Sequence, residues 1–101
     1  MALLIQLAGS ALRDLRRLED FLLEAQDPAA LALFDFVTDG LQVLPHQPAI
    51  GRPVSGGLRE LILHRGHSGY LALYRYLPHL GSVRVLRIRH QRESGYTDDE
   101  V

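Results

Sequence analysis

The sequence contains no cysteine, which excludes disulfide bonds and thiolate metal sites. It also contains no lysine, so all 11 basic residues are arginines, which bind carboxylates and phosphates but do not act as readily deprotonated amines. A GC-rich genome is the simplest explanation of this bias. No segment approaches the roughly 18 uncharged apolar residues of a membrane span, and the start lacks the basic residues of a secretory signal. We therefore expect a cytoplasmic protein with no membrane partner.

The 101 residues are enough for one small domain, which we place at residues 1–96. Residues 97–101 form an acidic tail that we expect to be flexible. Charge is unevenly distributed along the chain. Residues 1–49 hold three arginines against seven acidic residues, whereas residues 50–96 hold eight arginines against two. Such segregation indicates a basic surface that binds an anionic partner.

The first half of the sequence predicts a strand followed by two helices. The apolar run Leu3 to Ala8 is typical of a buried strand. Leucines then recur every three or four residues, which predicts an amphipathic helix over Ser10–Ala25 with Ser10 as its N-cap. Asp27 and Pro28 suit the cap and first position of a second helix, which continues to Pro45. We expect the two helices to form an antiparallel hairpin.

The second half predicts a sheet. Residues 46–57 are rich in proline and glycine and are expected to form a loop. Three segments with a period of two follow, namely Leu58–His64, Tyr70–Leu77 and Val83–His90, and short turns join them into an antiparallel meander. The predicted fold is therefore α+β, with the order β-α-α-β-β-β and the helices packed on one face of the sheet.

The last predicted strand carries residues that could act on RNA. Its alternation directs Arg87 and Arg89 away from the helices and directs Leu86, Ile88 and His90 toward them. Metal-free RNA cleavage needs a base, an acid and cations around the phosphate. His90 or Tyr96 could exchange protons, while Arg75, Arg87, Arg89 and Arg92 could bind the phosphate. The alternative, which we favour, is a solvated or partner-binding arginine face with a packed Tyr96 and a structural His90.

Other candidate sites are weaker, and no cofactor or metal is expected. His64 and His67 have a metal-like spacing but no third ligand. The glycines of residues 51–57 lack the lysine and hydroxyl residue that complete a phosphate loop. Tyr70, Tyr74 and Tyr76 share one strand face and could stack on bases, although such residues more often contact the core or a protein partner.

Five segments in this order resemble the ParE/RelE superfamily of bacterial toxins from type II toxin–antitoxin systems. They are Ala11 to Phe21, Leu41-x-x-Leu44-x-x-x-Pro48-x-x-Gly51-Arg52-Pro53, Leu58-Arg59-Glu60-Leu61, Gly69-Tyr70-x-x-Leu73-Tyr74-Arg75 and Val85-Leu86-x-Ile88-x-His90-Gln91-Arg92-Glu93-x-Gly95-Tyr96. The resemblance covers about Leu3 to Tyr96. It implies a toxin that arrests growth, takes part in functions such as plasmid stabilization, and forms a hetero-oligomer with a cognate antitoxin. The antitoxin would be a ribbon-helix-helix protein of the ParD type.

The resemblance leaves two targets open. ParE-like members inhibit DNA gyrase without a nuclease centre, and the long paired helices and the lack of lysine favour this branch. RelE-like members are ribosome-dependent mRNA endoribonucleases, for which His90, Arg92 and Tyr96 are the catalytic candidates here. A third alternative is an interaction module that has lost toxicity. For partner binding we expect Arg75, Arg87, Arg89, Arg92 and Tyr74 to contribute, and we expect no sequence-specific DNA binding.

Overall fold

The computed structural model describes residues Leu3–Tyr96, and the predicted flexible tail at residues 97–101 lies outside them. The main elements are β1 (Leu4–Leu7), α1 (Gly9–Glu24), a 3-10 helix (Pro28–Ala32), α2 (Leu33–Gly40), β2 (Arg52–Val54), β3 (Leu58–Arg65), β4 (Ser68–Leu77) and β5 (Ser82–His90). The strand order is β1-β5-β4-β3-β2, with β1 parallel to β5 and the other pairs antiparallel.

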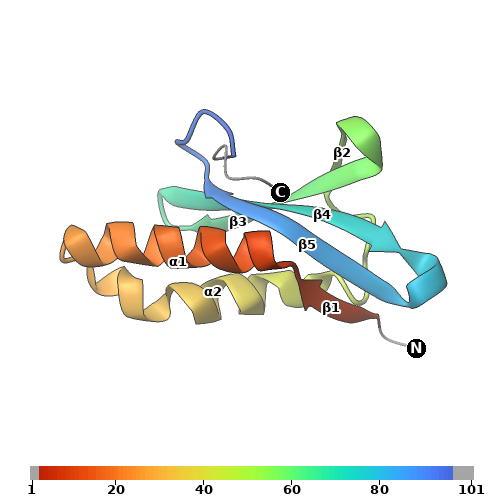
Figure 1. Ribbon diagram of the computed structural model, residues 1–101, viewed down its shortest axis with the longest axis horizontal. Coiled ribbons are helices and arrows are strands. Elements are labelled where there is room, and N and C mark those ends of the chain that lie inside the picture. Colours follow the sequence, from red (N-terminus) through yellow and green to blue (C-terminus); the bar gives the residue numbers. More distant parts are fainter. Residues whose placement is uncertain (1–2, 97–101) are drawn as a thin grey trace.

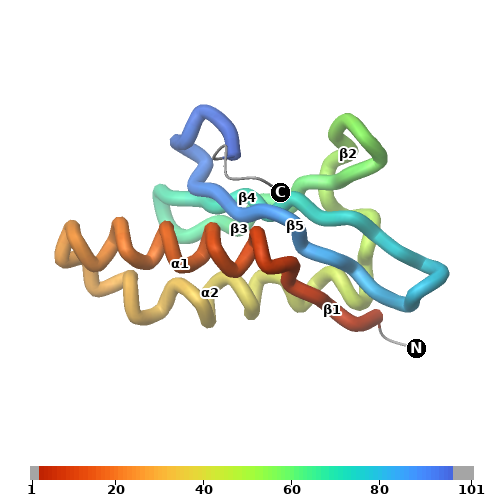
Figure 2. Tube along the Cα trace, in the orientation of Figure 1, coloured from red at the N-terminus to blue at the C-terminus, as the bar shows by residue number. Residues whose placement is uncertain are grey.

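The α-helices α1 and α2 lie on one face of the sheet, and no α-helix of residues 3–96 covers the other face (Figure 1). The chain turns from α1 toward α2 at the same end of the molecule as the β3–β4 turn (Figure 2). The predicted α+β architecture is confirmed. One expectation is wrong: residues 46–57 are not entirely a loop, because β2 pairs with β3 there as a short edge strand.

The helix boundaries differ from the prediction for local reasons. The N-cap of α1 is Ala8, whose carbonyl accepts from Ala11 N and Leu12 N, so Ser10 lies inside the helix and does not cap it. Asp27 caps the second helical segment as predicted, since its side chain accepts from Ala29 N at 2.9 Å. That segment starts as a 3-10 helix, however, and becomes α-helical only at Leu33.

A β-bulge in β5 determines which of its residues face the helices. Leu73 pairs with Arg87 and Tyr74 pairs with Val85, so Leu86 is an extra residue without a partner on β4. A bulge of this kind shifts the alternation by one residue. Val83 and Val85 before it, and Ile88 after it, are therefore all fully buried against the helices.

Tyr74 connects the core to the segment that precedes β2. Its side chain is completely buried, its hydroxyl donates to Pro48 O at 2.8 Å, and the same oxygen accepts from Gly51 N at 2.9 Å. This buried position contradicts the expectation that Tyr74 contacts a partner or stacks on a base.

We expect Tyr74→Phe to lower the free energy of unfolding by about 1–2 kcal/mol, because it leaves the Gly51 amide without its acceptor in a buried site. Urea unfolding measures this change. Tyr76→Phe is the matched control, because Tyr76 is 39% exposed and its loss of a hydroxyl should change stability little. Equal effects of the two substitutions would contradict the assigned role of the Tyr74 hydroxyl.

Candidate functional site at the C-terminal half of β5

The C-terminal half of β5 contacts polar side chains of α1. β1 pairs only with Ser82–Val85, so no strand within residues 3–96 lies beside the following residues of β5 on that side. The Ser10 hydroxyl donates to Leu86 O at 2.6 Å, and Asp14 Oδ2 accepts from Ile88 N at 2.8 Å. Helix residues four apart lie on one side of the helix, so these two contacts follow the strand edge. They satisfy backbone groups that would otherwise be open to another strand.

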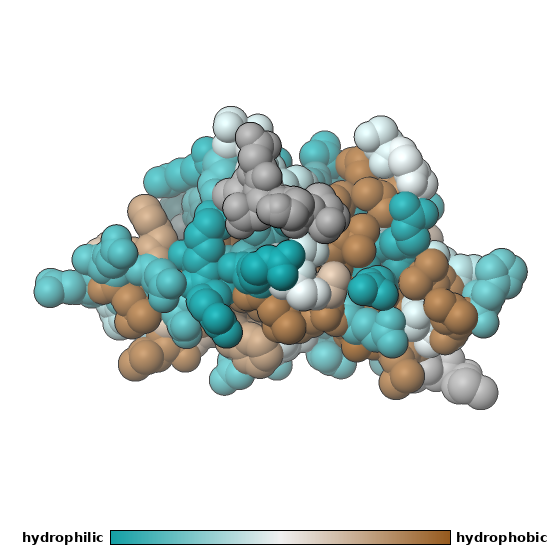
Figure 3. All heavy atoms as spheres, in the orientation of Figure 1, coloured by the Kyte–Doolittle hydropathy of each residue, from teal (hydrophilic) through white to brown (hydrophobic). Residues whose placement is uncertain are grey.

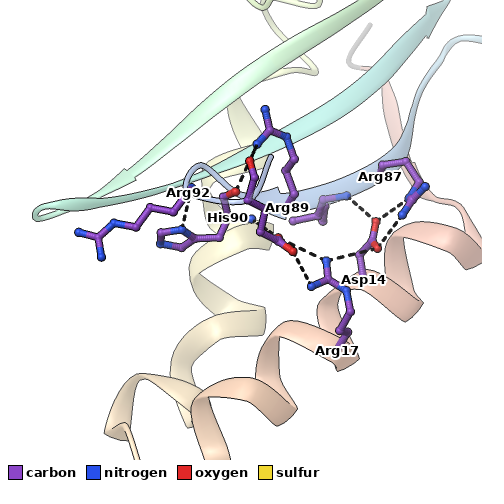
Figure 4. A network of polar contacts seen from close by, with 8 residues as sticks. Asp14, Arg17, Arg87, Arg89, His90 and Arg92 are labelled. Atoms are coloured by element: carbon purple, nitrogen blue, oxygen red, sulfur yellow. Dashed lines mark hydrogen bonds and ion pairs between the residues drawn. The ribbon is translucent and has the colours of Figure 1, made fainter. Parts of the chain in front are cut away.

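Asp14 and Arg87 form a buried ion pair. Arg87 Nε and Nη2 donate to the two carboxylate oxygens at 2.8 and 3.1 Å (Figure 4). Asp14 is 1% exposed and Arg87 is 4% exposed. The expectation that Arg87 lies on an exposed surface is therefore wrong, because α1 covers this edge of the sheet. The position of Asp14 on the apolar side of α1, beside Leu15 and Leu18, was the sequence signal for a buried cationic partner.

A second polar cluster lies at the exit of β5. Arg17 Nη1 donates to Glu93 Oε2 at 2.8 Å, and Glu93 Oε1 accepts from His90 N at 2.8 Å. Arg89 donates to the backbone oxygen of Glu93. These contacts hold the chain close to α1 as it leaves the strand (Figure 4).

Tyr96 lies over the helix-free side of the sheet. Its hydroxyl donates to Glu60 Oε2 at 2.7 Å, while Arg52 Nη2 donates to Glu60 Oε1 at 2.6 Å. The guanidinium of Arg89 lies over the Tyr96 ring at 5.2 Å from its centroid, and that of Arg87 at 5.6 Å. Such distances are those of cation–π contacts.

The environment of this cluster makes Tyr96 a hydrogen-bond donor. Burial and the hydrogen bond to Glu60 raise the pKa of Tyr96 well above its ordinary value of 10.0. Burial also raises the pKa of Glu60, but the hydrogen bonds from Tyr96 and Arg52 outweigh it, so the pKa of Glu60 lies below its usual range. Tyr96 therefore stays protonated and Glu60 ionised at neutral pH, which makes Tyr96 a poor general base.

His90 lies on the helix side of the sheet. Its ring packs edge-on against Tyr70 with centroids 5.0 Å apart, and its Nδ1 accepts from Arg92 N at 3.1 Å. His90 and Arg92 line a pocket of about 570 Å³ at the end of the molecule. The other lining residues are Arg17, Leu18, Phe21, Leu22, Asp27, Ala29, Arg65, Ser68, Tyr70 and Glu93.

The structure does not bring the three catalytic candidates to one point. Tyr96 contacts Glu60, Arg87 and Arg89, and the strand register places these three residues on the helix-free side of the sheet. His90 instead contacts Tyr70 of the core, on the helix side. Arg92 is exposed. Arg75 is also exposed, and its Nη2 lies 3.4 Å from Gly56 O.

The weaker candidates lie apart from this region or in the core. Tyr70 is buried like Tyr74, whereas His64 and His67 are exposed. Within residues 3–96, no group of three His, Cys, Asp or Glu side chains could hold a metal ion. In the same part of the chain, no helix is long and apolar enough to cross a membrane.

Over α1 and β5, hydrophilic side chains interrupt the hydrophobic surface, which forms separate patches (Figure 3).

Comparison with known proteins gives consistent matches along the chain. The family model described as "ParE toxin of type II toxin-antitoxin system, parDE" matches residues 5–95. "Toxin RelE3" of Caulobacter vibrioides is 34% identical, over 88% of this chain and 95% of that protein. "Toxin RelE1" of the same species is also 34% identical, over 92% of this chain and 98% of that protein.

Two solved structures share the fold. The chromosomal ParDE toxin–antitoxin system from P. aeruginosa aligns with a TM-score of 0.72 and 22% identity, covering 88% of this chain and 96% of that chain. The toxin–antitoxin complex RelBE2 from Mycobacterium tuberculosis aligns with a TM-score of 0.61 and 23% identity, covering 92% and 95%.

Proposed function

The chain belongs to the ParE toxin family of type II toxin–antitoxin systems, and from this premise we propose that it binds and inhibits DNA gyrase. The observation that carries this choice of target is the separation of His90 from Tyr96 by the sheet. A toxin that acts by binding needs an exposed surface, whereas a nuclease needs its acid, base and cations around one phosphate.

The charges around the two residues support the same proposal. The Tyr96 hydroxyl is engaged as a donor to an ionised Glu60, and the Arg87 guanidinium is neutralised by Asp14. His90 already accepts a backbone hydrogen bond at Nδ1. Using these groups on RNA would require several of the described contacts to be exchanged, and each exchange has an energetic cost.

A supercoiling assay with purified gyrase tests the proposal. We expect dose-dependent loss of supercoiling that the cognate antitoxin reverses. His90→Gln and Tyr96→Phe should retain inhibition and growth arrest, because neither hydrogen-bonding group performs chemistry. The opposite outcome is that both variants stay folded, the toxin leaves gyrase unaffected, and growth-arresting activity falls by about 10²-fold or more. That result would match the removal of an acid–base pair.

The second candidate function is ribosome-dependent mRNA cleavage. It is favoured by the names of the two curated relatives, both called RelE toxins. Primer extension on a translated message distinguishes it from gyrase inhibition, because new 5′ ends should appear only with a nuclease. Under our proposal, a preparation that inhibits gyrase produces no such ends.

We further propose that the partner is a ribbon-helix-helix antitoxin of the ParD type with an acidic, amphipathic segment. The neighbouring structures are named as toxin–antitoxin pairs. The pocket beside His90 combines apolar side chains, including Phe21 at 69% exposure, with the guanidinium groups of Arg65 and Arg92. Apolar anchors surrounded by arginines suit a peptide that carries both apolar and acidic residues. The exposed Arg75 and the half-exposed Arg89 remain candidates for further contacts.

Phe21→Ala should weaken antitoxin binding by about 30-fold, which corresponds to a hot-spot loss of about 2 kcal/mol. Isothermal titration calorimetry measures the affinity, and thermal unfolding should show little change because Phe21 is already mostly exposed. Phe34→Ala is the matched control: Phe34 is 49% exposed on α2 and does not line the pocket. Equal affinities for both variants would remove the pocket from the antitoxin interface.

A further inference from the structure

The helix-free face of the sheet holds two arginines directly opposite each other. Arg75 of β4 pairs in register with Arg84 of β5, and both side chains are exposed. Like charges in this arrangement repel each other. The hydrogen bond from Arg75 to Gly56 O, at 3.4 Å, does not neutralise its charge. The arrangement is therefore unfavourable unless an anionic group lies nearby.

The charge of this face is only partly balanced by the described residues. Five arginines lie on it by strand register, namely Arg52, Arg75, Arg84, Arg87 and Arg89. Glu60 pairs with Arg52, and Asp14 pairs with Arg87. Arg75, Arg84 and Arg89 form no ion pair with a carboxylate of residues 3–96. Three positive charges therefore remain on one sheet face.

The segment that follows Tyr96 contains three acidic residues, Asp98, Asp99 and Glu100. Tyr96 is held on the same face by the hydrogen bond from its hydroxyl to Glu60 and by the contacts of its ring with Arg87 and Arg89. Five extended residues span up to about 17 Å, and the three residues from Arg87 to Arg84 along the strand span about 10 Å. The acidic residues can therefore reach the pair from their anchor at Tyr96.

We propose that the surface formed by Arg75, Arg84 and Arg89 is a docking site for the chain's own acidic segment, Thr97–Val101. The number of acidic side chains equals the number of unbalanced arginines. Docking of the segment does not depend on which target the toxin inhibits. An acidic partner that uses the same face must first displace the segment.

The absence of cysteine allows a direct test. Val101→Cys introduces a single site for a nitroxide spin label in the 101-residue chain. At about 0.01 M salt, where charges act over about 30 Å, we expect the label to broaden the side-chain Nε–H signals of Arg75 and Arg84. At about 1 M salt, where the screening length is about 3 Å, the broadening should be lost.

Arg13 and Arg16 provide the matched internal control, because they are exposed on α1 and not on this face of the sheet. Their signals should remain sharp at both salt concentrations. In the labelled variant Asp98→Asn/Asp99→Asn/Glu100→Gln, the broadening of Arg75 and Arg84 should also disappear. Equal broadening of all four arginines, no broadening of Arg75 and Arg84, or broadening that persists in the neutral variant would each overturn the proposal.

Discussion

Replacing Asp14 with alanine is expected to destabilise the protein by about 3–5 kcal/mol, since breaking a buried ion pair leaves an uncompensated charge in the interior. The carboxylate accepts from Arg87 Nε and Nη2 and from Ile88 N, and it is 1% exposed. Its removal therefore affects both the guanidinium and the strand edge. Chemical denaturation of the purified variant measures the loss.

Two further variants separate the ion pair from a general effect of mutating α1. Asp20→Ala is the matched control, because Asp20 is exposed on the same helix, and it should change stability by no more than about 0.5 kcal/mol. Asp14→Leu/Arg87→Met should recover much of the loss, since no charge remains buried. If the double variant is less stable than Asp14→Ala, the buried charge is not the main cause of the destabilisation.

The sequence predicts helices and strands well where the hydrophobic residues repeat with a single period. The leucine spacing of α1 and the alternation in β3, β4 and β5 predict these four elements in their observed order. The Asp27–Pro28 cap is also confirmed, because its chemistry depends on adjacent residues alone. Ser10 shows the limit of this reasoning. It suits an N-cap, but its hydroxyl bonds to Leu86, 76 residues away.

The site could be predicted only in part, because its geometry depends on contacts between distant segments. Alternation correctly directed Ile88 toward the helices and Arg87 away from them. It could not show that α1 buries Arg87 at the sheet edge, or that β5 bulges at Leu86. Both features arise from how α1 and β4 meet β5. The sequence likewise shows 11 arginines but not which of them are already neutralised.

These internal ion pairs bear on how the toxin acts. Arg87 and Arg52 are bound by carboxylates of the same chain and stabilise the fold. Arg75, Arg84 and Arg92 are exposed and form no ion pair with a carboxylate of residues 3–96. A variant of a paired arginine would lose activity through instability, whereas a variant of an exposed one would lose it through binding. Activity measurements on this protein are therefore informative only when paired with unfolding measurements.

Gly51→Ala is expected to lower the free energy of unfolding by about 3 kcal/mol. This value is near the upper end of the usual cost of inserting a methyl group into a packed interior. A Cβ atom at this position would lie 2.7 Å from both Cε1 and Oη of Tyr74 and 2.9 Å from Glu60 O. The Tyr74 ring is fully buried and Glu60 O belongs to the sheet backbone, so neither can move easily. The substitution should also break the hydrogen bond between Gly51 N and the Tyr74 hydroxyl.

Gly40→Ala is the matched control for this prediction. Its Cβ would meet Leu63 Cδ2 at 2.6 Å, but that atom is the end of a flexible side chain. Alanine in a helix is more favourable than glycine by about 0.5–1 kcal/mol, so the net change should be small. The cycle Gly51→Ala with Tyr74→Phe should be less than additive, because both substitutions remove the same hydrogen bond. Strict additivity would mean that the clash at Gly51 is relieved without moving Tyr74.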